Sequence, residues 1–142
     1  MSKVAVVFWS GTGNTQTMAE KVLEGAKEAG ASAELFSVED FSADKMDSYD
    51  AVAFGCPAMG DEVLEEDVFE PVFRECEAKL KDKKIGLFGS YGWGDGEWMR
   101  SWEKTCREDG ALLAADCVIC NEEPDEEGLQ SCLNMGRALA EA

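Results

Sequence analysis

The stretch WSGTGNT, residues 9–15, follows the apolar run VAVVF and precedes a segment whose apolar residues are spaced three and four apart. A continuous apolar run is typical of a strand covered on both faces, and the spacing after it is typical of an amphipathic helix. Glycines and hydroxyls between the two indicate an anion-binding turn, because backbone N–H groups and the helix dipole hold a phosphate without a charged side chain. The stretch therefore predicts a phosphate loop in an α/β unit.

The alternation of strand and helix patterns continues along the chain. Apolar or alternating runs predict strands at residues 3–9, 32–38, 49–56, 83–89 and 111–120. Helical spacing marks residues 18–26, 69–80, 98–106 and 129–136, whereas residues 41–47 are too short and polar to predict a helix. We expect an α/β fold: a doubly wound, five-stranded parallel sheet with helices on both faces.

Length and composition limit the kind of protein. The 142 residues are 45% hydrophobic and contain no linker or repeat, so we expect one domain over residues 1–142. The longest apolar runs are too short to span a bilayer, and the N-terminus has no cleavage site, so we expect a cytoplasmic protein. The net charge of -17 argues against nucleic acid and anionic membranes as partners.

The six cysteines raise the question of a metal or disulfide site. Cys117 and Cys120 form a CxxC pair, but they fall in a predicted strand, where positions i and i+3 point to opposite faces. The chain has no second CxxC and no histidine. We therefore expect buried, reduced cysteines and no metal.

The phosphate loop does not match two common nucleotide motifs. A nucleotide hydrolase needs GxxxxGK[ST], which is absent from the chain. A dinucleotide site needs GxGxxG, and Gln16 stands where the third glycine would be. An ordinary polar turn remains the alternative for this loop taken alone.

Two further loops follow predicted strands and should meet the first at the carboxyl edge of the sheet. They are CPAMGDEVLEED, residues 56–67, and GSYGWGDGEWM, residues 89–99. A large aromatic among glycines, such as Trp93, usually has a flat partner. The three loops in this order, followed by NEEPDE, resemble the flavodoxin family, specifically its short-chain bacterial members, over nearly the whole chain. Residues 111–120 run directly into NEEPDE, which resembles the short form without an inserted segment.

The resemblance implies the strand order 2-1-3-4-5 for the sheet and non-covalent FMN as the cofactor. Flavodoxin is itself a standard example of a flavin at the switch point of such a sheet, so that placement comes from the family. The phosphate would lie in residues 10–15, the ring between Met59 and Trp93, and Glu62 would bind the pyrimidine end. Pro57 stands where some members have a phosphate-binding serine. The implied site residues are Ser10, Gly11, Thr12, Gly13, Asn14, Thr15, Pro57, Ala58, Met59, Gly60, Asp61, Glu62, Ser90, Tyr91, Gly92 and Trp93.

The implied function is a low-potential one-electron carrier that passes between the quinone, semiquinone and hydroquinone states of FMN. With both faces of the ring covered, only its edge could exchange electrons, which disfavours hydride transfer. A small flavin-dependent reductase, for example of quinones, is the alternative, and a flavin-free receiver-like module is a third possibility. The expected partners of this monomer are redox enzymes with basic docking surfaces: ferredoxin-type oxidoreductases, reductases and hydrogenase. Acids expected around the flavin are Asp61, Glu62, Glu65, Glu66, Asp95 and Glu97.

Overall fold

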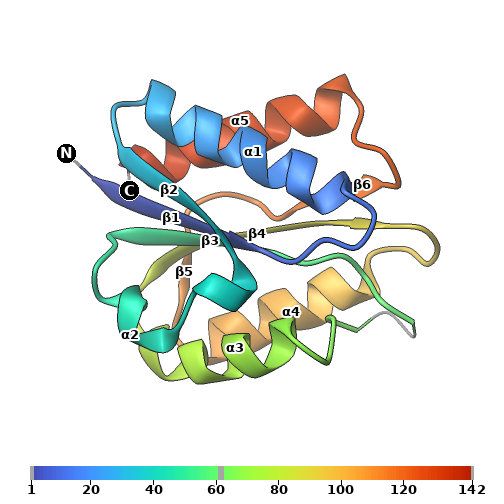
Figure 1. The fold of residues 1–142 in the computed structure, drawn as a ribbon, viewed down its shortest axis with the longest axis horizontal. Helices are drawn as coiled ribbons and strands as arrows, with labels where there is room; N and C mark the ends of the chain where they lie inside the picture. The colour runs from blue at the N-terminus through green and yellow to red at the C-terminus, as the bar shows by residue number, and fades with distance from the viewer. Residues whose placement is uncertain (1, 61–62, 142) are drawn as a thin grey trace.

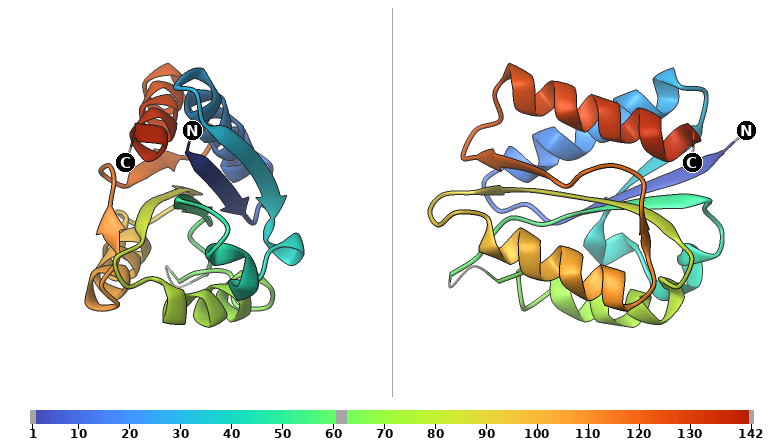
Figure 2. Two further views of the ribbon diagram at one scale, coloured as in Figure 1. Left: turned by 90° about the vertical axis from the view of Figure 1, so that its left-hand side faces the viewer. Right: turned by 180° about the vertical axis from the view of Figure 1, so that it is seen from behind.

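The computed structural model describes residues 2–60 and 63–141, which form a parallel sheet between two layers of helices (Figure 1). The strands are β1 (Lys3–Phe8), β2 (Ser32–Ser37), β3 (Ala51–Gly55), β4 (Lys84–Tyr91), β5 (Leu112–Leu113) and β6 (Val118–Asn121). The helices are α1 (Asn14–Glu28), α2 (Ala43–Met46), α3 (Phe69–Cys76), α4 (Glu97–Glu108) and α5 (Glu126–Glu141), with 3-10 turns η1 (Val38–Asp40) and η2 (Glu77–Lys79). Figure 2 shows α1 and α5 on one face of the sheet and α3 and α4 on the other.

The sheet has the strand order β2-β1-β3-β4-β5, and its paired strands are parallel. This order confirms the predicted doubly wound fold. The chain order reverses between β1 and β3, so the loops that follow these two strands diverge and leave a crevice at the carboxyl edge.

The prediction of one continuous last strand over residues 111–120 is wrong. β5 pairs with β4 through Ile85 and Leu113, and β6 pairs with it through Phe88 and Val118. Between these pairs β4 has two residues, 86 and 87, while the segment that joins β5 to β6 has four, 114–117. The excess cannot enter the ladder, so the edge breaks into two strands and the described residues form six strands rather than five.

One strand is longer than predicted, and one helix was not predicted. β4 runs on through Ser90 and Tyr91, which were expected in a loop, because both residues pair with β6. Residues 43–46 form the one-turn helix α2, although the sequence around it is polar; Met46 is buried beneath the helix and anchors it.

Alternate residues of the central strands enter two separate cores. Val4 and Val6 of β1 pack with α1 and α5, whereas Ala5 and Val7 pack with α3 and α4. All four side chains are fully buried. The continuous apolar run that opened the sequence is therefore explained by burial on both faces.

α1 and α5 cross at two glycines. A Cβ on Gly25 would lie 2.0 Å from the carbonyl oxygen of Leu133, and one on Gly136 would lie 2.0 Å from that of Val22. Only glycine allows the two backbones to approach this closely. The crossing holds α1, and with it the loop of residues 10–13, against α5.

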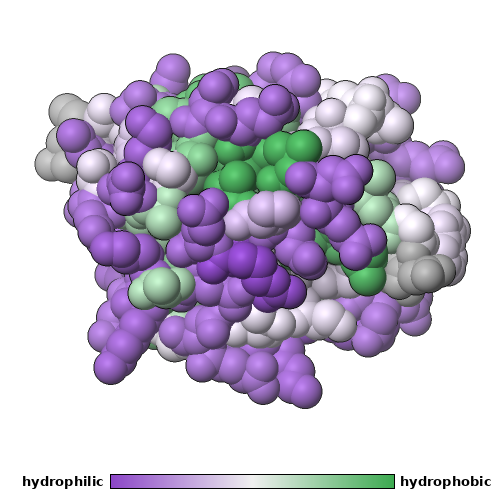
Figure 3. Space-filling model, turned by 60° about the horizontal axis from the view of Figure 1, so that its bottom comes forward, coloured by the Kyte–Doolittle hydropathy of each residue, from purple (hydrophilic) through white to green (hydrophobic). Residues whose placement is uncertain are grey.

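Hydrophilic side chains cover most of the face in Figure 3, and hydrophobic ones gather in one area among them. Among the described residues, no helix is long and apolar enough to cross a bilayer.

Candidate flavin site

A cleft of about 580 Å³ opens at the carboxyl edge of the sheet. This volume is in the usual range for a small-molecule site. Three loops, which follow β1, β3 and β4, meet there, together with the chain that follows β6. The lining residues are Trp9, Gly11, Thr12, Asn14, Pro57, Ala58, Met59, Ser90, Tyr91, Gly92, Glu122 and Glu123. The structure thus brings nine of the predicted site residues into one cleft.

The first loop leaves the start of α1 open to the cleft. Gly13, the residue before the helix, has φ +98° and no side chain with which to cap it. The first turn contains no acidic residue. The first N–H groups of a helix lack intrahelical partners, and Thr12 accepts only that of Asn14, so this helix end offers donors and a positive dipole.

Two hydroxyls of this loop accept backbone N–H groups and keep a hydrogen to donate. Ser10 Oγ accepts the N–H of Gly13 at 3.0 Å, and Thr12 Oγ1 accepts that of Asn14 at 3.4 Å. A hydroxyl that accepts a backbone bond still has its own hydrogen to donate. Thr12 lines the cleft, whereas Ser10 and Gly13 shape the turn behind it.

Thr15 connects the first loop to β4 rather than lining the cleft. Its Oγ1 lies 2.9 Å from Ser90 Oγ, and only 1% of Thr15 and 4% of Ser90 are exposed. Either hydroxyl can be the donor. The pair fixes the phosphate loop relative to the third loop.

The second loop carries Met59 into the cleft. Met59 and Val63 exchange backbone hydrogen bonds of 2.8 and 3.1 Å, which close a tight turn. Gly60, within this turn, is exposed and has φ +47°. The predicted contacts of Asp61 and Glu62 lie outside the described residues.

The third loop places Tyr91 in the cleft but leaves Trp93 outside its lining. Trp93 is 63% exposed, which is the largest value among the exposed large hydrophobic residues. Tyr91 packs on Trp98 with ring centroids 5.5 Å apart, and Trp98 Nε1 donates to the carbonyl of Cys56 at 3.1 Å. The placement of the ring between Met59 and Trp93 stays a prediction.

Sequence reasoning missed three residues of the cleft: Trp9, Glu122 and Glu123. Trp9 belongs to the quoted loop, and its backbone N–H donates to Gly55 at 3.0 Å. The two glutamates follow β6, so their position after a strand at the same edge was the available signal.

Three of the acids expected around the flavin form ion pairs or hydrogen bonds with other residues of the protein. Asp95 and Glu97 both pair with Arg100 Nη2, at 2.9 and 2.8 Å. Glu65 is 6% exposed, and its carboxylate accepts the N–H groups of three residues at the start of α3. Burial raises the pKa of Glu65, but the three N–H bonds outweigh it and hold the pKa below its usual value. Glu65 therefore caps a helix and does not face the cleft.

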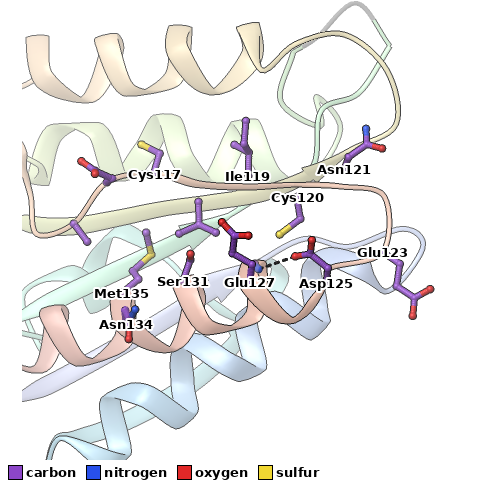
Figure 4. A pocket seen from close by; sticks show the side chains of 14 residues that line it. Cys117, Ile119, Cys120, Asn121, Glu123, Asp125, Glu127, Ser131, Asn134 and Met135 are labelled. Carbon is purple, nitrogen blue, oxygen red and sulfur yellow. Dashed lines mark hydrogen bonds between the residues drawn. The ribbon is translucent and has the colours of Figure 1, made fainter.

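A second cavity, of about 570 Å³, lies between β6 and α5 (Figure 4). Four of its lining residues are the carboxylates Asp116, Glu123, Asp125 and Glu127, which would repel a phosphate. Asp125 Oδ1 also accepts the N–H of Gly128 at 2.8 Å, so it compensates the start of α5. The first cleft is thus the better phosphate site.

Figure 4 also shows the two residues of the CxxC pair on opposite sides of the chain. Cys117 packs with the core beneath α4, and Cys120 packs with the core beneath α1 and α5. All six cysteines are free thiols, and burial raises the pKa of Cys117 to about 12. Cys117 and Cys120 therefore do not form a common site.

The first cleft fits a flavin mononucleotide. A helix start without an acid and a hydroxyl that can donate suit a phosphate, while Met59, Tyr91 and Trp9 offer apolar surface to a flat ring. A doubly wound sheet with such a cleft at its switch point places the protein in the class of α/β proteins that bind a ligand at the carboxyl edge of the sheet.

Comparison with known proteins gives the family. Residues 6–136 match the family model described as flavodoxin. The chain is 46% identical to the flavodoxin of Megasphaera elsdenii over 139 residues, covering 98% of this chain and 99% of that protein. It is 44% identical to that of Clostridium beijerinckii over 135 residues, covering 95% and 97%.

A solved structure agrees with these relatives. The two-electron reduced Megasphaera elsdenii flavodoxin in solution matches with a TM-score of 0.90 at 47% identity, covering 98% of this chain and 99% of that one. The chain therefore belongs to the flavodoxin family, and it is an FMN-dependent electron carrier rather than an enzyme.

Proposed function

We propose that FMN binds in the cleft of about 580 Å³ with its phosphate at the start of α1. The observation that carries this proposal is the open helix start, where a glycine precedes the helix and the first turn has no acid. Thr12, Asn14 and the backbone of Gly11 line the cleft beside it. A phosphate dianion there would supply the acceptors that this helix lacks.

FMN accepts and donates single electrons, and the residues around it decide where they go. Met59 and Tyr91 line the cleft as apolar walls, which exclude water from the bound ring. We propose that Trp93 completes the second wall, so that only the edge of the ring faces a partner. Such a cover disfavours hydride transfer and leaves the alternative of a quinone reductase without support.

The Thr12→Ala variant tests the phosphate position. Loss of a charge-assisted bond should weaken FMN binding by about 1.5–3 kcal/mol and leave riboflavin binding unchanged. The measurement is a fluorescence titration of the apoprotein with each flavin. Thr105→Ala, on α4, is the matched control. An equal loss for FMN and riboflavin would remove Thr12 from the phosphate.

We propose that the carrier works at low potential and docks on redox enzymes with basic surfaces, such as ferredoxin-type oxidoreductases, reductases and hydrogenase. Glu122 and Glu123 are exposed and line the cleft. Their charges disfavour further negative charge in the cleft and attract a basic partner toward it. Asp95 and Glu97 contribute less to this field because Arg100 pairs with both.

Replacing Glu122 and Glu123 by glutamine tests this proposal. The midpoint of the second couple should rise, and electron transfer to a basic partner should depend less on ionic strength. The control is Glu75→Gln with Glu141→Gln, which removes two exposed acids far from the cleft. If the two double variants behave alike, the acids serve solubility.

We also propose a cytoplasmic monomer. All six cysteines are free thiols, which a reducing compartment preserves. Net charge of -17 disfavours self-association. Sedimentation across a range of salt concentrations tests the oligomeric state, and a dimer at physiological salt would contradict it.

A further inference from the structure

The loop from Cys56 to Glu65 joins β3 to α3 and carries Met59 into the cleft. Its two ends meet: the N–H of Glu65 donates to Cys56 Sγ at 3.3 Å. Neither Cys56 nor Glu65 lines the cleft itself. The loop is thus closed at its base by a contact between a thiol and the backbone.

Glu65 is anchored beyond the loop. Its Oε1 accepts the N–H groups of Val68 and Phe69, both at 2.7 Å, and its Oε2 accepts that of Asp67 at 2.9 Å. Within the described part of the chain, no lysine or arginine pairs with this carboxylate. The N–H groups of residues 67–69 therefore stabilise the negative charge of Glu65, and these bonds fix one end of the loop.

Cys56 is anchored on the other side. Its N–H donates to Phe88 of β4 at 3.1 Å, and its carbonyl accepts Trp98 Nε1 of α4 at 3.1 Å. The side chain is fully buried, and its S–H donates to the carbonyl of Pro57 at 3.5 Å. A Cβ on Gly89 would lie 2.2 Å from the Cys56 carbonyl oxygen, so β4 also approaches closely. The Cys56 sulfur thus sits at a fixed point from which it can hold Glu65.

We propose that Cys56 and Glu65 are positioning residues that clamp the base of this loop and so place Met59 against the flavin. The proposal rests on the proposed function, because it assumes that the flavin ring lies beside Met59. With its base closed in this way, the loop holds Met59 at the wall of the cleft.

A buried cysteine can also be a simple apolar filler, and Cys76 provides the matched control. Cys76 is fully buried in the same core as Cys56 and lies at the far end of α3. Filler alone would make alanine equally disruptive at both positions. If Cys56 is a clamp, its replacement by alanine should weaken flavin binding more than that of Cys76 does. Serine should substitute for Cys56, because a hydroxyl can accept the Glu65 N–H.

The experiment compares the full-length variants Cys56→Ala, Cys56→Ser and Cys76→Ala with the wild type. FMN and riboflavin affinities are measured by titrating each apoprotein, and the first midpoint by redox titration of each holoprotein. We expect Cys56→Ala to weaken both flavins by about two- to tenfold, the scale of one lost hydrogen bond. It should also shift the first midpoint, and Cys56→Ser should restore both quantities.

Cys76→Ala should change neither quantity, even where thermal denaturation shows a loss of stability. Equal effects of the two alanine variants, or no rescue by serine, would overturn the clamp. Failure of the proposed function is visible separately, since wild-type protein would then bind riboflavin as tightly as FMN.

Discussion

α1 and α3 both begin at the carboxyl edge of the sheet, yet their first N–H groups meet different acceptors. At α3 the buried carboxylate of Glu65 accepts the N–H of Phe69, the first residue of the helix, and those of the two residues before it. At α1 the neutral hydroxyl of Thr12 accepts the N–H of Asn14, and the first turn has no acid. In a protein with 30 acidic residues, the helix start without a carboxylate is the one that suits a phosphate.

The largest expected effect comes from opening the closed helix start. Glu65→Ala would leave one buried and two partly buried N–H groups without their acceptor, so the apoprotein should lose about 2–3 kcal/mol of unfolding free energy. Urea unfolding of the apoprotein measures this loss. The neighbouring Glu66 is exposed, and Glu66→Ala should change stability by no more than about 0.5 kcal/mol. Similar losses for both variants would mean that the cap is dispensable.

The reverse change closes the open helix start. Asn14→Asp places a carboxylate in the first turn of α1, so the apoprotein should gain about 0.3–1 kcal/mol in stability. FMN binding should weaken by about 2 kcal/mol, because two like charges about 4 Å apart repel by about 1–4 kcal/mol near a protein surface. Riboflavin affinity should not change.

Gln16→Glu is the control, since Gln16 is exposed in the same turn but does not line the cleft. It should give the stability gain with a smaller loss of FMN affinity. An Asn14→Asp protein that binds FMN normally would place the phosphate elsewhere.

A variant with a smaller expected effect tests binding of the flavin ring independently of the phosphate. Trp93→Ala should weaken FMN and riboflavin equally, by about 0.5–1.5 kcal/mol, because stacking concerns only the ring. Flavin fluorescence should increase, since a close indole quenches it. Unchanged emission together with unchanged affinity would show that the exposed Trp93 does not cover the flavin.

The smallest expected effect concerns a carboxylate at the opposite end of a helix. Asp109 follows α4, and a hydrogen bond with Glu77, burial and repulsion from nearby acids raise its pKa to about 6. Its proton is bound more tightly in the folded protein, so this contribution to stability is present at low pH and is lost as pH rises through about 6.

Asp109→Asn should therefore stabilise the apoprotein more at pH 7.5 than at pH 4.5, in urea unfolding at both values. Asp116→Asn, at an exposed position, is the control. A gain that is the same at both pH values would contradict the role of this proton. The contrast between Glu65, whose pKa is lowered beside a helix start, and Asp109, whose pKa is raised beside a helix end, would then not extend to stability.

The order of strands and helices was predictable because a strand that is buried on both faces has a continuous run of apolar residues. Residues 4–8 are apolar throughout since Val4 and Val6 face one core and Ala5 and Val7 face the other. The break between β5 and β6 was not predictable from apolar character. It depends on a mismatch of two residues against β4, which exists only when the strands are paired.

The site likewise has features that could be predicted from the sequence and features that could not. The sequence by itself determined the phosphate loop and the three strand ends that meet around it, because glycine, hydroxyl and apolar patterns act over a few neighbouring residues. Only the tertiary structure decided which acids are free: Glu65 and Glu122 are both glutamates in acidic stretches, yet one is buried against N–H groups and the other lines the cleft. The tertiary structure also joined Cys56 to Glu65 and Thr15 to Ser90. These contacts depend on where distant segments lie in space, and a single sequence carries no local signal for that distance.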